Sequence, residues 1–237
     1  MPVPVEINTE AVQDGATEPS NLHLSSTKAV RALSPAQERK LVDHLEDRFL
    51  DITRNYKKRS DPSSTLATLS AYLEATHHLL FLILQIPPVD PSAPLRTSLL
   101  LRLTGEVLSS IPGYVPDMET LPLLLAYLTD LDHGWLAVLR GQAWDADASA
   151  GVDAELPDGA RASRMSQTER TRLRSLLLGG TDAIEEWMEK LDTQGLGFEV
   201  VLQRVGLEQS FNDLFSETLS EMGSLAGENP QGMIGTC

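Results

Sequence analysis

Two acid–histidine pairs with the same spacing are the residues of this sequence that could do chemistry. Glu74 stands three positions before His77, and Asp130 stands three positions before His133. On a helix this spacing places both side chains of a pair on one face. Bundles that hold two iron or manganese ions use Glu-x-x-His twice and take two further glutamates from the other helices. The four residues are therefore the candidate metal ligands.

A dinuclear site would also need Glu46 and Glu106, on two other predicted helices, and no motif positions either of them. Asp130 is shorter than the glutamate of the pattern and would reach a metal differently. His78 points about 100° away from His77, so these neighbours do not hold one ion together. Acid–histidine pairs at this spacing also recur by chance on solvated helices. We therefore favour a polar helix face, expect no cofactor, and keep a metal-dependent enzyme as an alternative.

Basic residues gather at two places, and both are candidates for binding a partner. The first group surrounds a predicted helix start, the wrong end of the helix dipole for cations, which indicates an acidic partner or the protein's own acidic loop. Its members are Arg161, Arg164, Arg170, Arg172 and Arg174. The second group, Lys57, Lys58 and Arg59, stands at a predicted helix C-terminus, where cations suit the dipole. That local role is favoured over a nucleic-acid or nuclear-import patch.

Trp144 is the third candidate for partner binding. It heads residues 142–164, whose composition predicts a mobile loop. A tryptophan at this place either holds the loop onto the bundle or anchors a partner, and we favour the first role.

The charge balance argues against nonspecific binding to nucleic acids and anionic membranes, although it does not exclude a local basic patch. The chain has 34 acidic and 19 basic residues and a formal net charge of −15, whereas nucleic acids and anionic membranes attract cationic surfaces. Its one cysteine, Cys237, allows neither an intrachain disulfide nor a cysteine-based zinc site. The sequence contains no phosphate-binding P-loop and no G-x-S-x-G elbow. Because we find no signal-peptide pattern and no apolar run near the roughly 20 residues of a membrane span, we expect an intracellular protein.

Apolar residues recur every three or four positions through most of the chain, which predicts amphipathic helices. The expected helices cover residues 35–59, 65–86, 94–111, 117–140, 166–191, 198–205 and 207–222. Strand signals are nearly absent, and short connections imply antiparallel neighbours. The sequence therefore predicts an all-α fold, a single bundle of six or seven mostly antiparallel helices over residues 34–223, with disordered tails at 1–33 and 224–237.

Local chemistry marks several helix boundaries. Ser34 before a proline, and an S-x-x-E box at Ser166, predict two helix starts, and Asp117 is expected to cap a third. Gly179-Gly180 interrupts an in-phase apolar pattern, and we favour two helical segments there over one kinked helix. The apolar residues around Leu82 predict a helix end that is buried on several sides.

Four stretches resemble a family of small uncharacterised proteins of filamentous fungi. They are LSPAQERKLVDHLEDRFLDITRNYKKR, LILQIPPVDPSAPLRTSLLLRLTGEVLSSIPGY, LDHGWLAVLRGQAWD and SQTERTRLRSLLLGGTDAIEEW, and the resemblance covers roughly residues 34–223. Some members of that family bear the name of a meiotic recombination protein of the RecA-like kind. Because the P-loop of such ATPases is missing here, the resemblance implies at most an accessory role in recombination or DNA repair.

Together these features predict a non-enzymatic helical adaptor or complex subunit in the nucleus or cytoplasm. Its expected partner is another protein, with no membrane and, given the net acidity, no nucleic acid. The alternatives are the accessory recombination factor and the metal-dependent helical-bundle enzyme.

Overall fold

Helices make up most of this computed structural model, which describes residues 30–155, 164–191 and 195–227. The five long helices are α1 (Pro35–Lys57), α2 (Leu69–Leu84), α3 (Ala93–Ser110), α4 (Leu121–Leu139) and α5 (Gln167–Met188). The shorter elements are the 3-10 turn η1 (Ile111–Gly113), the strands β1 (Ala143–Asp145) and β2 (Ala150–Val152), and the helices α6 (Phe198–Val205), α7 (Glu208–Asn212) and α8 (Ser216–Gly227). The predicted all-α bundle is confirmed.

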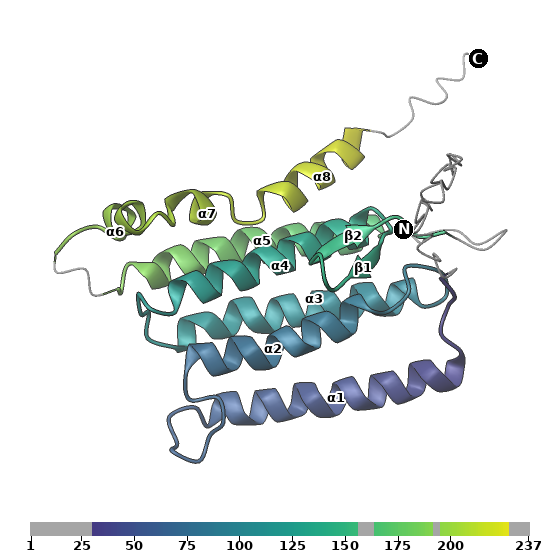
Figure 1. Cartoon of the computed structure of the whole chain (residues 1–237), viewed down its shortest axis with the longest axis horizontal. Coiled ribbons are helices and arrows are strands. Elements are labelled where there is room, and N and C mark those ends of the chain that lie inside the picture. The colour runs from purple at the N-terminus through teal and green to yellow at the C-terminus, as the bar shows by residue number, and fades with distance from the viewer. Residues whose placement is uncertain (1–29, 156–163, 192–194, 228–237) are drawn as a thin grey trace, which may run out of the picture.

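Successive long helices run in opposite directions, and α2 lies between α1 and α3 (Figure 1). α2 packs against α1, α3 and α4, while α3 also packs against α5. The segment from α6 to α8 runs along the opposite side of the bundle from α1, and α8 packs on α4 (Figure 1). This arrangement leaves one face of α2 uncovered between α1 and α4.

Capping side chains start the long helices where the sequence predicts it in two of three cases. The Ser34 hydroxyl accepts the backbone N–H of residue 37, and the Ser166 hydroxyl accepts that of Glu169, in complete capping boxes. The expected cap at Asp117 is wrong, because α4 begins at Leu121. The backbone N–H and hydroxyl of Thr120 both donate to the Asp117 carbonyl, so these residues form a turn before the helix.

The expected break in α5 at Gly179-Gly180 is also wrong, since the helix is continuous through both glycines. Gly180 is buried against α3, and a Cβ placed on it would overlap Leu108 Cδ1 and lie 3.0 Å from Leu108 Cγ. The Thr181 hydroxyl donates to the Leu177 carbonyl at 3.0 Å instead of capping a new helix. The glycine allows close approach of two helices and does not end one.

Residues 142–164 were expected to form a mobile loop, but they begin with a β-hairpin. β1 and β2 pair antiparallel, with Trp144 opposite Gly151. Gly151 packs closely against Ala137 of α4, because a Cβ built on Gly151 would lie 2.8 Å from the Ala137 Cβ. The hairpin therefore lies directly against the helix. Residues 156–163 lie outside the described part of the chain.

The C-terminal region differs from the expected helix at 207–222. Phe215, whose φ is +57°, separates α7 from α8, and α8 continues to residue 227, beyond the predicted start of the tail at 224. Residues 1–29 and 228–237 of the predicted tails lie outside the described residues. At the other end, the Leu33 N–H donates to Ser92 Oγ at 2.9 Å, so the chain is already fixed before α1.

Two buried tryptophans fix the centre of the bundle. Trp135 Nε1 donates to Thr104 Oγ1 at 3.0 Å, and Trp187 Nε1 donates to the Tyr114 carbonyl at 2.7 Å. Each bond satisfies an indole N–H that would otherwise be buried without a partner, and so each adds specificity to apolar packing. Within the described residues, no helix combines the length and apolar character needed to cross a bilayer.

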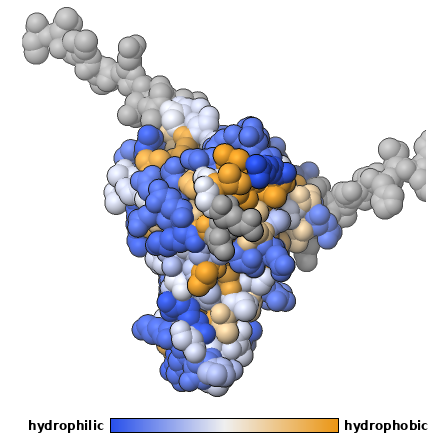
Figure 2. All heavy atoms as spheres, turned by 90° about the vertical axis from the view of Figure 1, so that its left-hand side faces the viewer, coloured by the Kyte–Doolittle hydropathy of each residue, from blue (hydrophilic) through white to orange (hydrophobic). Residues whose placement is uncertain are grey.

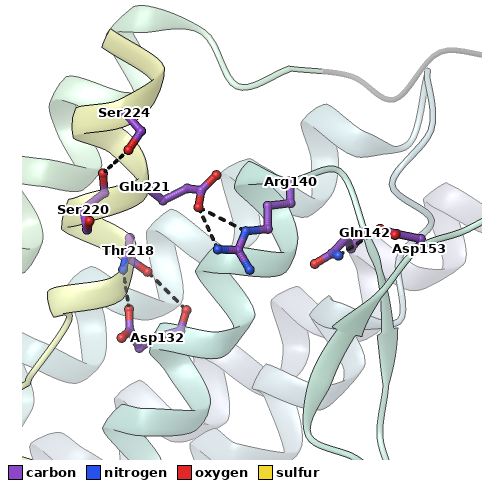
Figure 3. A network of polar contacts seen from close by, with 8 residues as sticks. All are labelled: Asp132, Arg140, Gln142, Asp153, Thr218, Ser220, Glu221 and Ser224. Carbon is purple, nitrogen blue, oxygen red and sulfur yellow. Dashed lines mark hydrogen bonds and ion pairs between the residues drawn. The ribbon is translucent and has the colours of Figure 1, made fainter. Parts of the chain in front are cut away.

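A polar network fastens α8 to α4 (Figure 3). The Thr218 N–H donates to Asp132 Oδ1 and the Thr218 hydroxyl to the Asp132 carbonyl, both at 3.2 Å. Burial raises the pKa of the Asp132 carboxyl above its ordinary value. Closer to the surface, Arg140 Nη2 lies 2.7 Å from Glu221 Oε2. The hollow beside this ion pair is lined by polar residues, and the Arg140–Glu221 contact within the chain lies across it. We therefore assign the hollow a structural role.

Candidate functional site

The uncovered face of α2 is the candidate functional site. Its exposed residues follow one stripe, Glu74, His78, Leu82 and the C-capping Gln85. Glu74 is the only Asp, Glu, Lys or Arg in the whole helix. Leu82 is 39% exposed, so the expectation that it is buried is wrong. A helix face with so little charge, in a protein with a net charge of −15, is unusual for a purely solvated surface.

A hollow of about 710 Å³ runs between α1 and α2, and we call it the α1–α2 groove. Ala71 and Ala75 contribute small side chains to its lining. Apolar residues make up much of the lining, and polar ones come from both helices. The groove is lined by His44, Arg48, Asp51, Ile52, Thr65, Leu66, Ala71, Glu74, Ala75, His78, Leu79, Phe81, Leu82 and Gln85.

A smaller hollow of about 260 Å³ lies on the other side of the same stripe, between α2 and α4, and we call it the α2–α4 pocket. It is lined by Ser70, Leu73, Glu74 and His77 of α2 and by Leu123, Ala126, Tyr127 and Asp130 of α4. Glu74 lines both the pocket and the groove. The two hollows therefore form one continuous surface across α2.

The α2–α4 pocket contains the one pair of candidate ligands that the fold brings into contact. His77 Nε2 lies 2.8 Å from Asp130 Oδ2. A carboxylate only accepts hydrogen bonds, so Nε2 is the protonated nitrogen in this contact. The His77 ring packs 4.5 Å from the Phe81 ring and 5.6 Å from that of Tyr127, measured between centroids. These contacts hold the imidazole in place against α4.

The structure does not assemble the set of ligands that a metal ion needs. Glu46 and Glu106, which would have to complete the site, both pair with Arg102 instead, at 2.6 Å and 2.9 Å. The His133 Nδ1 atom is buried without a hydrogen-bond partner. Among the described residues, no group of three or more His, Cys, Asp or Glu side chains could hold a metal. Within the described residues, the four candidate ligands therefore form one acid–histidine contact, His77 with Asp130, and no larger group.

The arginines near the start of α5 differ in how exposed their side chains are. Arg164, Arg172 and Arg174 are exposed, whereas Arg170 is half-buried and its Nε is buried without a partner. Arg161 lies outside the described residues. An exposed cationic surface on the first turns of α5 is thus present, and its proposed acidic partner stays a prediction.

The cluster at the end of α1 is also divided. Lys57 and Lys58 are exposed, but Arg59 is half-buried and donates from Nε to the Gly113 carbonyl at 2.8 Å. Its guanidinium lies 4.5 Å from the centre of the Tyr56 ring. Arg59 therefore fastens the end of α1 to η1, and binding of a partner by this cluster stays a prediction.

Trp144 is buried, with 7% of its surface exposed, and its ring lies 6.3 Å from that of Phe81. It holds the hairpin onto the bundle, which is the favoured of its two predicted roles. The alternative of an exposed anchor for a partner is corrected, because an anchor must be accessible in the free protein.

The end of the bundle near α6 is a third surface with exposed apolar residues. Figure 2 shows them in several separate areas with hydrophilic residues between them. Val115, at 85%, is the most exposed of the large hydrophobic residues described. Scattered apolar residues are normal on protein surfaces, whereas the stripe on α2 combines them with two hollows.

No protein-family model, no curated protein and no solved structure matches this chain.

Sequence reasoning found residues on both sides of the pocket but missed others that line the two hollows. His77 and Asp130 were singled out by their spacing, but Tyr127, Leu123 and the groove residue His44 were not. A usable signal was present in α2, where exposed positions at intervals of four, four and three residues include one charge. That pattern distinguishes a semi-exposed interaction face from an ordinary solvated one.

Proposed function

We propose that this protein is a non-enzymatic helical interaction protein and that it receives an amphipathic helix of another protein in the α1–α2 groove. The observation that supports this function is the groove itself, a hollow of about 710 Å³ with Ala71 and Ala75 in its lining and Leu82 exposed beside it. Small side chains let another helix approach closely, and an apolar floor gives it a surface to bury.

A helix is the occupant that the shape favours. The groove follows α2, whose 16 residues span about 24 Å, the length of between four and five helical turns. Amphipathic helices bind such grooves with side chains spaced three and four residues apart. The rim residues Arg48, Asp51 and Glu74 carry both signs of charge around the apolar lining, which matches the polar rim of protein interfaces.

The exposed arginines of α5 support a second binding surface. Arg172 and Arg174 form no ion pair with the described residues, so they are free to meet an acidic partner. No hollow is associated with them, and we therefore rank this surface below the groove. An accessory role in recombination is a further proposal, supported by the resemblance of sequence alone.

The experiment compares partner recovery by the full chain and by matched variants. Ala75→Arg fills the groove, and Gly179→Arg adds the same side chain on α5, where nothing lies within 4 Å of the new Cβ. Recovery of a specific partner, quantified by mass spectrometry, should fall at least tenfold with Ala75→Arg and stay unchanged with Gly179→Arg. Leu82→Glu should act like Ala75→Arg without changing the floor of the groove.

Equal recovery by wild type and both groove variants would exclude this function for the groove. The double variant Arg172→Glu/Arg174→Glu tests the other surface in the same assay. Loss of the partner with this variant alone would place the interface on α5. Circular dichroism and thermal unfolding of every variant separate loss of binding from loss of fold.

A further inference from the structure

We infer that the α2–α4 pocket receives the side chain of a lysine or arginine carried by the partner helix. This inference rests on the proposed function and names the partner's chemistry at one position. It follows from the charge, the size and the apolar walls of the pocket.

The pocket is lined by two acids and by neither lysine nor arginine. Glu74 and Asp130 line it, and α2 and α4 contain no lysine or arginine along their whole lengths. His77 already contacts Asp130, and a carboxylate with two oxygens can accept further hydrogen bonds from a cation. The net charge of −15 adds long-range attraction for a basic partner.

The walls suit the methylene groups that carry such a cation. Leu73, Leu123 and Ala126 line the pocket, and Leu123 is 45% exposed. Lysine and arginine bury their stems along apolar surface while the charged end meets polar groups. At about 260 Å³ the pocket is smaller than the roughly 300–1,000 Å³ of sites for whole small-molecule ligands, so one side chain is the better fit.

One helix could occupy both hollows. Glu74 lines the groove and the pocket, so a helix lying along the stripe of α2 has side chains on either side of this residue. Apolar side chains would enter the α1–α2 groove, and a basic side chain facing the other way would enter the α2–α4 pocket. The pocket then sets the specificity of the partner and the groove supplies apolar burial.

The test uses small probes and nuclear magnetic resonance of the full chain. The probes are the Nα-acetyl methylamides of lysine, arginine and norleucine, the last being an uncharged analogue of lysine. Lysine and arginine probes should produce saturable shifts at His77, Ala126 and Asp130. The norleucine probe should bind at least about fivefold more weakly, because it lacks the charge.

Variants of the pocket complete the test. Glu74→Gln and Asp130→Asn should each weaken binding of the lysine probe by about two- to fivefold, while Asp47→Asn, an exposed carboxylate of α1 that lines neither hollow, should leave it unchanged. Equal binding of norleucine and lysine, or unchanged binding by both pocket variants, would overturn the inference. If Ala75→Arg abolishes partner recovery but Glu74→Gln and Asp130→Asn do not, the groove is the interface and the basic side chain is wrong.

Discussion

Adjacent glycines in α5 should respond in opposite directions to the same substitution. A methyl group on Gly179 meets nothing within 4 Å, whereas on Gly180 it overlaps Leu108 Cδ1 and lies 3.0 Å and 3.1 Å from Leu108 Cγ and Cβ. Both glycines lie inside one continuous helix. The pair therefore separates helix propensity from packing against α3.

The magnitudes follow from these two effects. Gly→Ala inside a helix gains up to about 1 kcal/mol of stability from lower backbone entropy in the unfolded chain. That gain stands alone in Gly179→Ala. In Gly180→Ala it is opposed by overpacking, which costs about 1–3 kcal/mol in a filled core. We expect Gly179→Ala to be stabilised, Gly180→Ala to be neutral or destabilised by up to about 2 kcal/mol, and the two to differ by about 1–3 kcal/mol.

Urea unfolding followed by circular dichroism measures the difference, and thermal unfolding should separate the midpoints by about 2–4 °C per kcal/mol. Two results would refute the reasoning. If Gly180→Ala were as stable as Gly179→Ala, α3 and α5 would not be in close contact at Leu108. If Gly179→Ala were strongly destabilised, the helix would be interrupted at this point, as the sequence alone suggested.

Three further perturbations test the polar contacts of the core and of α8. Burial raises the folded-state pKa of Asp132, so the wild type should lose stability relative to Asp132→Asn as the pH rises from about 4 through that raised value. Urea unfolding at several pH values measures this change. A difference in unfolding free energy that stays constant with pH would contradict it. Trp135→Phe should lower the free energy of unfolding by about 1–2 kcal/mol more than Trp144→Phe, because of these two indoles the Trp135 N–H alone has a hydrogen-bond partner. Equal losses in the two variants would contradict this. Glu221→Gln should lower the free energy of unfolding by less than about 1 kcal/mol, since Arg140 is 47% exposed, and the loss should shrink in 1 M salt. A larger loss that does not depend on salt would contradict this account of the ion pair.

The predictable parts of the fold are those decided within a few residues of the chain. Ser34 and Ser166 predict the starts of their helices correctly, because a capping box is built from residues that are close in sequence. Gly180 was misinterpreted because its reason is Leu108, which lies on a different helix. The hairpin around Trp144 was missed because its strands have three residues each and depend on packing against α4, with no alternating pattern to reveal them.

The candidate site was predictable only in part, for the same reason. The spacing of Glu74 and His77 identified a functional-looking face, and Asp130 proved to be the contact of His77. The expected role changed because Arg102, on α3, binds Glu46 and Glu106. That interaction joins two helices whose relative positions no local pattern specifies. The α1–α2 groove likewise exists only after α1 and α2 have packed together.

Site-specific photo-cross-linking tests the central claim most directly. A benzophenone amino acid is placed at Leu82, on the stripe beside the groove, and in a matched protein at Leu178 of α5, which is similarly exposed at 44%. We predict a discrete adduct from position 82 that maps to an amphipathic helical segment of one partner and disappears with Ala75→Arg, and no such adduct from position 178. The same adduct from position 178, with none from position 82, would contradict a partner-binding groove between α1 and α2.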